Sequence, residues 1–465
     1  MSGKNWVLVS LLAAASCTVG PDYERPVFFD DAQLSRALSA EQGNSLPVSV
    51  LWYRQFEDRT LNSLVERALA GSPNVQIAVQ KLKQARYTLM INEAEFLPRL
   101  NAAGGYDYNY LANGKKLPRT VEDYYKVGLD ASWEIDIWGG GRRLNEESRA
   151  LMRAAADNLV NVMLSMTAEV ANDYIGLRTA QEQLRITKEN LRLQQDIYQT
   201  VKEKYDNGLA DDAALNQAEF AVQTTKALLP ALEQQEESYK NALAVLLGEL
   251  PGSLPELEKD KNNLIGRSFF FHVDNLYNYP VSSVRSRPDV RMAENVLIAK
   301  NAAIGQAVAD LFPNVSISGV LGWQAKHFSG LGSSSAAAYG FAPAVSMPLF
   351  NFGQLINQVK LNEEIKEEYV YLYQNTLLGA VEEVKNATVS VRKEYERYQA
   401  LNKSVRNMKQ VLSSMRDKYK EGLIEFSDML VTEQNLLEAQ NNLAASGGSI
   451  YHNIIGFYKA VGGGY

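Results

Sequence analysis

One apolar ladder occurs twice in this sequence and limits the fold more than any other feature. Its rungs stand seven residues apart in both copies, and the second copy starts 214 residues after the first. The first copy comprises Met163, Val170, Leu177, Leu184, Leu191, Tyr198 and Tyr205, and the second comprises Leu377, Val384, Val391, Tyr398, Val405, Leu412 and Tyr419. A spacing of seven is the seam of a coiled coil, so each copy predicts a helix far longer than a globular core requires.

Shorter motifs repeat together with the ladder. Both copies end on Tyr-x-x-Gly-Leu, at 205–209 and 419–423. In each half, two prolines 25 residues apart frame a shorter helix, Pro73 with Pro98 and Pro288 with Pro313. The chain therefore reads as an internal duplication, with two intertwined halves of one architecture.

After the second proline of each pair the period changes from helical to two, which is typical of β-strands. The clearest run has one apolar face, formed by Val127, Leu129, Ala131, Trp133, Ile135 and Ile137, and a polar face between them. Such runs approach the roughly 9 to 11 residues that a tilted strand needs to cross a bilayer. A soluble sandwich with one wet face is the alternative. Pro348 fits a strand end, whereas Pro343 interrupts the last expected strand.

Four strands per chain cannot close a membrane barrel, because about eight is the smallest number that works. Several chains must then share one barrel, and the periodicity does not choose among two, three or four copies. We therefore expect an α+β membrane protein in which a shared β-barrel is continued by a long α-helical coiled-coil tunnel.

The expected order of segments follows from these signals. We expect a signal peptide at 1–16, a lipidated extended arm at 17–60, a first repeat at 61–248, a linker at 249–285 and a second repeat at 286–465. The first repeat holds a helix, strands at 99–112 and 121–138, a long helix at 142–207, a tip and a return helix at 214–248. The second holds a helix at 288–312, strands at 313–326 and 338–351, a long helix at 353–420, a tip and a return helix at 428–460.

The N-terminus carries an export signal. Lys4 precedes an apolar stretch from Trp6 to Ala15, which is too short to span a membrane and is typical of a bacterial signal peptide. Cys17 follows it and is the only cysteine of the chain, so no disulfide can form within one chain. A lone cysteine at this place is where bacteria attach diacylglycerol, and Thr18 after it favours the outer membrane. The alternative is a buried cysteine without a role.

Charge and composition argue against several functions. Removing residues 1–16 takes away one lysine, so the formal net charge changes from -7 to -8, which argues against a nucleic-acid partner. The three histidines, His272, His327 and His452, are scattered and predict neither a zinc site nor a catalytic triad. Gly139 to Gly141 is a turn without phosphate-loop spacing. We expect neither an enzyme nor a cofactor.

Several motifs in a fixed order carry a resemblance. They are Cys17 to Pro26, Ser286 to Val290 and the terminal Gly462 to Tyr465. Together with the order of elements they resemble the bacterial outer-membrane factor family, the TolC-like exit ducts, over Cys17 to Tyr465. The chain is most similar to the lipoprotein branch that serves resistance-nodulation-division multidrug efflux pumps.

The resemblance implies a passive export duct for drugs or other toxic small molecules. It implies a homotrimer whose chains share a twelve-strand barrel in the cell outer membrane, with a long periplasmic helical tunnel and an acyl chain on Cys17 in the outer-membrane lipid. The implied partners are a periplasmic adaptor, also called a membrane fusion protein, and an inner-membrane resistance-nodulation-division transporter. A structural periplasmic coiled-coil lipoprotein tether, whose strands form a soluble cap, is the alternative.

The family closes its duct at the helix tips with charged and aromatic rings. Its usual pattern has an aspartate six residues after the tip glycine in both halves and another nine after it in the second half. Asp428 fits the first of these places after Gly422, whereas Ala214 and Val431 occupy the other two. The expected gate residues are therefore Asp211, Asp212, Glu425 and Asp428, with Lys418 and Tyr419 as latch partners.

The tips have a second expected role. Their turns, Gly208, Leu209, Gly422 and Leu423, are the expected adaptor-docking residues. Carboxylates crowded around one axis raise one another's pKa and attract cations, which suits a gate. The alternative is that these carboxylates only cap helices and solvate a turn.

Overall fold

The computed structural model describes residues 18–38, 50–111, 120–259, 264–265 and 282–464. The expected signal peptide and Cys17 lie outside these residues, as do parts of the expected arm and linker. Within the described residues, no helix is both long enough and apolar enough to cross a membrane.

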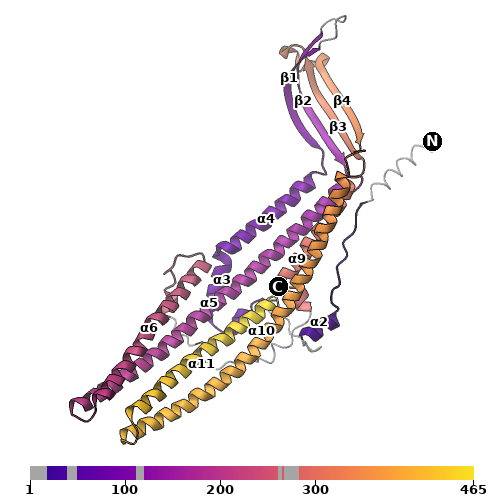
Figure 1. Cartoon of the computed structure of the whole chain (residues 1–465). Coiled ribbons are helices and arrows are strands. Elements are labelled where there is room, and N and C mark those ends of the chain that lie inside the picture. Colours follow the sequence, from indigo (N-terminus) through magenta and orange to yellow (C-terminus); the bar gives the residue numbers. More distant parts are fainter. Residues whose placement is uncertain (1–17, 39–49, 112–119, 260–263, 266–281, 465) are drawn as a thin grey trace. The chain divides into compact units, whose positions relative to one another are not determined.

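The chain runs through two similar series of elements (Figure 1). The first series, with the segment before it, comprises α2 (Asp31–Leu38), η1 (Trp52–Phe56), α3 (Arg59–Gly71), α4 (Pro73–Ala94), β1 (Arg99–Leu111), β2 (Thr120–Ile135), α5 (Gly140–Asp206) and α6 (Asp212–Leu246). The linking segment contains α7 (Glu256–Lys259) and α8 (Ser282–Arg285). The second series comprises α9 (Pro288–Ala309), β3 (Asn314–Ala325), η3 (Phe328–Gly330), η4 (Ser334–Ala336), β4 (Ala337–Ser346), α10 (Gln354–Lys420) and α11 (Phe426–Ala460).

The duplication is visible in the lengths of the helices. α5 and α10 have 67 residues each, α6 and α11 have 35 each, and α4 and α9 have 22 each. At about 1.5 Å per residue the two long helices are each about 100 Å long. The ladder predicted from the sequence therefore lies on two helices of equal length.

The chain forms two compact units, and each takes residues from both repeats. Unit 1 comprises 1–27, 80–156 and 292–375, and unit 2 comprises 28–79, 157–291 and 376–465. Unit 1 contains the whole sheet, and unit 2 contains both helix tips. Neither repeat forms a unit by itself, because each unit contains segments from both halves of the sequence.

The four strands of unit 1 form one antiparallel sheet in the order β1-β2-β3-β4 (Figure 1). Its register places Leu129 beside Leu321 and Leu321 beside Tyr339, so one face is apolar. On the opposite face Asp130 accepts a hydrogen bond from Asn101, and Lys126 pairs with Asp107. The apolar face stays exposed to solvent in the single chain, with Tyr339 at 85%. A sheet with an uncovered apolar face is suited to contact with lipid.

The ladder is largely buried in unit 2. Val170, Leu177 and Val384 are fully buried, as a coiled-coil seam requires. Tyr205, the last rung of the first ladder, differs because it is 38% exposed.

The structure corrects several expected boundaries at strand and helix ends. β4 ends at Ser346 and not at 351, just before Met347 and Pro348, and a proline cannot donate to a ladder. β2 ends at Ile135 and not at 138. α9 ends at Ala309 and not at 312, because tighter turns take over there, with Phe312 N–H bonded to the Ala309 carbonyl at 3.0 Å.

Two return helices and the arm also differ from expectation. α6 begins at Asp212 and α11 at Phe426, each two residues before the expected start, because Asp211 and Glu425 are the N-cap residues. The arm was expected to be extended to residue 60, but it includes α2 and η1, and α3 begins within it at Arg59. The Asp58 side chain accepts a hydrogen bond from Leu61 N–H at 3.0 Å and so sets that start.

Pro343 lies inside β4, opposite Ile317 of β3. β4 is the last strand of the sheet order, so its outer edge has no partner within the described chain. Proline is tolerated on the edge of a single chain's sheet, because its missing N–H there removes no bond from that chain's own ladder. The place of β4 at the edge of the chain's own sheet is thus compatible with a proline that the strand pattern alone left unexplained.

Candidate gate at the helix tips

The two tips of unit 2 have the same backbone turn. After α5, the N–H of Gly208 bonds to the Tyr205 carbonyl at 2.9 Å and that of Leu209 to the Lys204 carbonyl at 2.7 Å. After α10, the corresponding bonds join Gly422 to Tyr419 at 3.1 Å and Leu423 to Lys418 at 2.9 Å. This is the Schellman motif, and it needs a left-handed residue at the glycine. Gly208 and Gly422 have φ values of 73° and 74°.

The expected gate carboxylates do different things at the two tips. Asp211 accepts a hydrogen bond from the Ala214 N–H at 2.8 Å, so its side chain acts as the N-cap of α6. Glu425 is the N-cap of α11, but its side chain makes no capping bond. Asp428 lies in the first turn of α11 and is exposed to solvent. A negative side chain in a first helical turn is also stabilised by the helix dipole.

A contact between the two repeats joins the tips. The Lys204 ammonium lies over the ring of Tyr419, 4.7 Å from its centroid. The same ring packs against Phe426, with centroids 5.8 Å apart. Tyr419, one of the two expected latch residues, therefore has a cation on one side and an aromatic partner from α11.

Tyr205 has a comparable neighbour in its own repeat. The nearby Asp212 carboxylate raises the pKa of the Tyr205 hydroxyl, through hydrogen bonding and its negative charge. Lys418, the second expected latch residue, is exposed. Within the described chain its ammonium makes no hydrogen bond, ion pair or ring contact.

An apolar cluster from both repeats lies under these side chains. It contains Val201 and Ala218 of the first repeat with Leu412, Phe426 and Met429 of the second, all buried. Because its members come from four helices, the cluster holds the two tips of one chain together. At the ends of the tips the apolar side chains of Leu209 and Leu423 are exposed, at 77% and 66%.

A buried ion pair close to the second tip was not expected from the sequence. Arg416 donates to the Glu433 carboxylate at 3.0 Å, and the Glu433 side chain is only 1% exposed. Burial raises the pKa of Glu433, although the charge of Arg416 opposes this. The corresponding residues of the first repeat, Lys202 and Glu219, are both exposed. The pair therefore makes the two tips chemically unequal.

One signal for these residues was present in the sequence. Lysine precedes the tip tyrosine in both repeats, at Lys204-Tyr205 and Lys418-Tyr419. The shared motif is thus Lys-Tyr-x-x-Gly-Leu, one residue longer than the motif that identified the duplication. Nothing comparable marks Arg416 and Glu433, since both repeats carry a basic and an acidic residue at these places.

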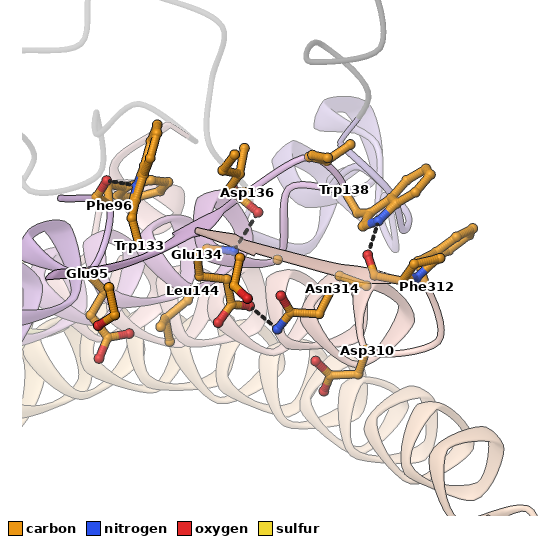
Figure 2. A pocket seen from close by; sticks show the side chains of 18 of the residues that line it. Glu95, Phe96, Trp133, Glu134, Asp136, Trp138, Leu144, Asp310, Phe312 and Asn314 are labelled. Atoms are coloured by element: carbon orange, nitrogen blue, oxygen red, sulfur yellow. Dashed lines mark hydrogen bonds between the residues drawn. The ribbon is translucent and has the colours of Figure 1, made fainter. Parts of the chain in front are cut away.

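Unit 1 contains a cavity of about 580 Å³ where the strands meet the helices (Figure 2). Several carboxylates line it, and two of them bond to other residues of the lining. Glu134 accepts from Asn314 at 2.7 Å, and Asp136 accepts from the backbone of Gly141 at 3.1 Å. Two indole N–H groups donate to backbone carbonyls in the segments that follow α4 and α9: Trp133 of β2 donates to Phe96 at 2.8 Å, and Trp138, just after β2, donates to Pro313 at 2.7 Å. These bonds join the ends of strands and helices, so we interpret the cavity as part of a structural junction.

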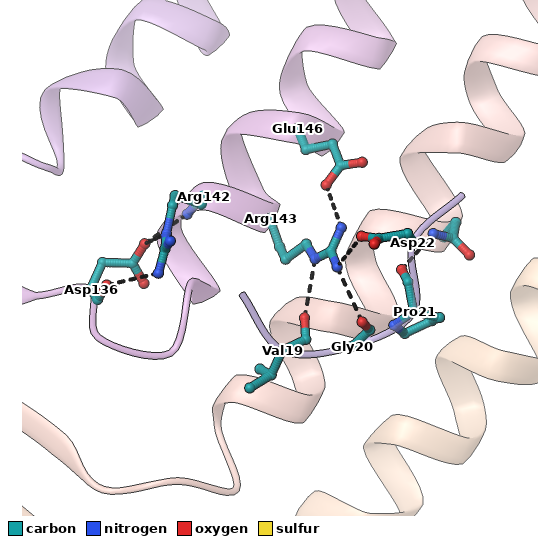
Figure 3. A network of polar contacts seen from close by, with 9 residues as sticks. Val19, Gly20, Pro21, Asp22, Asp136, Arg142, Arg143 and Glu146 are labelled. Atoms are coloured by element: carbon teal, nitrogen blue, oxygen red, sulfur yellow. Dashed lines mark hydrogen bonds and ion pairs between the residues drawn. The ribbon is translucent and has the colours of Figure 1, made fainter. Parts of the chain in front are cut away.

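A polar network attaches the N-terminal segment to α5 in the same unit (Figure 3). The buried guanidinium of Arg143 donates to the carbonyls of Val19 and Gly20, both at 3.1 Å, and to Asp22 at 2.9 Å. Glu146 neutralises it from the same helix at 2.7 Å. The segment directly after Cys17 is therefore fixed by one side chain of α5.

Across the described ranges, no group of three histidine, cysteine, aspartate or glutamate side chains is arranged to hold a metal ion. His452 bonds through Nδ1 to Asn172 at 2.8 Å, and burial lowers its pKa. This histidine is a packed helix residue with one polar partner.

Comparison with known proteins relates this architecture to outer-membrane channels. The model of the family described as outer membrane efflux protein matches residues 64–249 and 280–463. The cation efflux system protein CusC of Escherichia coli O6:H1 is 26% identical over 459 residues, which covers 98% of this chain and 97% of that protein. The toluene efflux pump outer membrane protein TtgI of Pseudomonas putida is 26% identical over 478 residues, which covers 100% and 99%.

Solved structures are similar over almost the whole chain. The outer-membrane channel OprN matches with a TM-score of 0.86 and 30% identity, covering 96% of this chain and 99% of that one. The Campylobacter jejuni CmeC outer membrane channel matches with a TM-score of 0.85 at 23% identity, covering 97% and 95%, and shows the fold alone.

These likenesses confirm the expected fold class, a trimeric barrel with a helical tunnel, and the expected role as an outer-membrane exit duct. They do not fit the periplasmic tether, and the relatives are transport channels and not enzymes. With both repeats matched by the family model, the chain belongs to the outer membrane efflux protein family.

Proposed function

We propose that this chain is the exit duct of a tripartite efflux pump and that its paired helix tips close the periplasmic end. Three copies supply four strands each to one barrel of twelve. A periplasmic adaptor docks on the tips, and an inner-membrane resistance-nodulation-division transporter supplies the energy. The cargo is small toxic molecules such as drugs, which the transporter selects.

The observation that carries the proposed gate is the contact of Lys204 with Tyr419. It joins the two repeats at the tips and lies above the apolar cluster that packs them together. A cation on an exposed aromatic face contributes about 0.5–1 kcal/mol, which is strong enough to bias a closed state and weak enough for a partner to reverse. The adaptor then opens the duct by separating these contacts.

The proposed docking surface is the pair of exposed leucines, Leu209 and Leu423. Each follows a left-handed glycine, Gly208 or Gly422, so the turn fixes where the leucine is presented. Apolar side chains held in this way favour a partner with complementary apolar pockets.

The proposed lipid anchor is a diacylglycerol on Cys17. The Arg143 network supports it, because that network holds Val19 and Gly20, which immediately follow the cysteine and Thr18, on α5. The described residues that follow the proposed lipid site are therefore held on the protein.

The experiment that tests the gate is single-channel conductance of the purified protein in a planar bilayer. We expect Asp211→Asn with Asp428→Asn to raise the conductance, because charge at the tips is lost. Asparagine at 211 keeps the helix cap that alanine would destroy, so the change isolates charge from folding. Each single variant is the matched control, and unchanged conductance in the double variant would remove these carboxylates from the gate.

A further inference from the structure

Unit 1 contains a second cavity, of about 470 Å³, and α5 supplies most of its lining. Three arginines of α5 line it, Arg142, Arg149 and Arg153. Their spacings of seven and four residues place them on one face of the helix. The helix tips of the proposed gate belong to unit 2, so this cavity has no part in the gate.

The three arginines differ in the partners that they already have. Arg142 donates to the Asp136 carboxylate at 3.2 Å and to two backbone carbonyls, so it is held in place (Figure 3). Arg149 pairs with Glu93 at 3.1 Å, and about half of each side chain is exposed. Arg153 is exposed, and within the part of the chain that the structure describes its guanidinium has no ion pair and no hydrogen bond.

Two of these guanidinium groups are therefore available to a ligand. Arg149 and Arg153 stand four residues apart, so they are neighbours on the helix surface, where two like charges repel each other. An exposed pair such as Arg149–Glu93 contributes little to stability and can be exchanged for another partner. An anion between Arg149 and Arg153 would relieve their repulsion.

A buried polar group without a partner lines the same cavity. Asn145 is only 9% exposed, and its side-chain carbonyl oxygen is buried with no hydrogen-bond donor among the described residues. A buried acceptor without a donor costs free energy, so such an atom indicates a bound molecule that supplies the donor. The carboxylate of the lining, Glu146, already pairs with Arg143 at 2.7 Å (Figure 3).

The rest of the lining is apolar and consists of Phe96, Ala150 and Ile298. The volume lies within the usual range for small-molecule sites, which are mostly apolar with a few polar groups that orient the ligand. Arginine is suited to phosphate and carboxylate groups, because its donors form a planar fork. A fitting ligand thus combines an anionic group with an apolar portion.

We propose that this cavity binds an anionic amphiphile, a molecule in which a phosphate or carboxylate group adjoins an apolar portion. The anionic group lies between Arg149 and Arg153, and a hydroxyl group of the ligand or a bound water molecule donates to Asn145. A membrane phospholipid and a free small molecule both have this chemistry. The inference goes beyond the proposed function and does not depend on it.

Isothermal titration of the purified protein with octyl phosphate, in a neutral detergent, tests the proposal. Arg153→Gln should weaken binding by about tenfold, the usual effect of losing one charge-assisted hydrogen bond. Glu93→Gln should instead strengthen binding, because Arg149 loses its partner and becomes free for the ligand. A cluster with only a structural role would not give opposite effects for these two substitutions.

Controls cover both the protein and the ligand. Arg192→Gln is the matched variant, because Arg192 is an exposed arginine of the same helix outside the cavity, and it should leave binding unchanged. Octyl ammonium, which is cationic, and inorganic phosphate, which has no apolar portion, should both bind more weakly than octyl phosphate. Equal losses of affinity in Arg153→Gln and Arg192→Gln would overturn the proposal, as would equal binding of octyl phosphate and octyl ammonium.

Native mass spectrometry of the protein extracted in mild detergent identifies the source of the ligand. A phospholipid that stays on the native protein and on Arg192→Gln, but is lost from Arg153→Gln, would assign the cavity to a membrane lipid. Binding of octyl phosphate without a retained phospholipid would assign it to a free small molecule. If neither binds, the proposal is wrong, and the export duct stands because it does not use this cavity.

Discussion

At the scale of single residues, the tip glycines give the clearest prediction. Nothing lies within 4 Å of a Cβ added to Gly422, so a substitution there costs only backbone strain. An L-residue in the left-handed region costs roughly 1–2 kcal/mol. We therefore expect Gly422→Ala to speed amide exchange of Leu423 about tenfold, because its bond to Lys418 opens more often.

Asparagine tolerates this backbone conformation better than alanine, so Gly422→Asn is the matched variant. It should lie between the native protein and Gly422→Ala in exchange rate. If the turn presents Leu423 to an adaptor, drug resistance should fall in the same order while the trimer stays intact. Loss of the trimer would assign the glycine to folding and not to docking.

Asp173 gives a prediction about pH. Burial and the neighbouring Glu169 raise the pKa of Asp173 from 3.8 to about 6. The folded chain then favours the protonated form, so this stabilisation is complete below pH 3.8 and is lost as the pH rises towards 6. Asp173→Asn should unfold at a higher temperature than the native protein at pH 7, and the difference should vanish near pH 4. Circular dichroism of the helices measures both, and a difference independent of pH would contradict the assignment.

The residues of the proposed gate show what sequence could predict at this scale. The duplicated Tyr-x-x-Gly-Leu motif pointed to the correct turns, because a left-handed glycine leaves a local signature. The contact between Lys204 and Tyr419 could not be predicted in this way, since it joins residues 215 positions apart on neighbouring helices. The Arg416–Glu433 pair could not be predicted either, because its burial depends on which residues cover that face of the helix.

At the scale of elements, two facing glycines allow two strands of the sheet to approach closely. Gly128 of β2 lies opposite Gly322 of β3, and a Cβ on Gly322 would clash with the Val127 carbonyl oxygen. We expect Gly322→Ala to force the strands apart, at a cost of about 1–3 kcal/mol for overpacking. The yield of folded trimer on unheated gels should fall.

Gly319 on the same strand is the matched control for that substitution. A Cβ there meets only the Gly340 carbonyl oxygen at 3.6 Å, which is an ordinary contact. Gly319→Ala should therefore leave the yield unchanged. Equal losses in both variants would mean that β3 needs glycine for flexibility and not for close packing.

The elements themselves followed from periodicity, whereas their ends did not. Each long ladder indicates a helix at every one of its repeats, so α5 and α10 could be predicted. A periodic pattern does not report the few local bonds that set the end of an element. Such bonds set the end of β4 at Ser346 and the start of α6 at Asp212. The short helix α2 was missed because eight residues carry too little periodicity.

At the scale of the whole molecule, the duplication yields two units, each built from both repeats. A sequence repeat alone suggests two similar domains, but equal helices of 67 residues reach from one unit into the other. The two faces of the sheet were predictable because residues alternate along each strand. The number of chains was not, because the open edges of four strands fit several ring sizes.

The last prediction concerns what holds the duct in the outer membrane. A diacylglycerol on Cys17 and the apolar face of the sheet would both bind lipid, but their contributions are unequal. The two acyl chains of a diacylglycerol can hold a protein on a membrane, but they do not approach the binding of an element that spans it. The sheet presents a full row of large apolar side chains from each chain, including Leu321, Tyr339 and Phe341. Cys17→Ala should therefore remain in the membrane fraction and still require detergent for extraction. A variant that appears in the soluble periplasmic fraction as folded protein would show that lipid, and not the sheet, is the anchor.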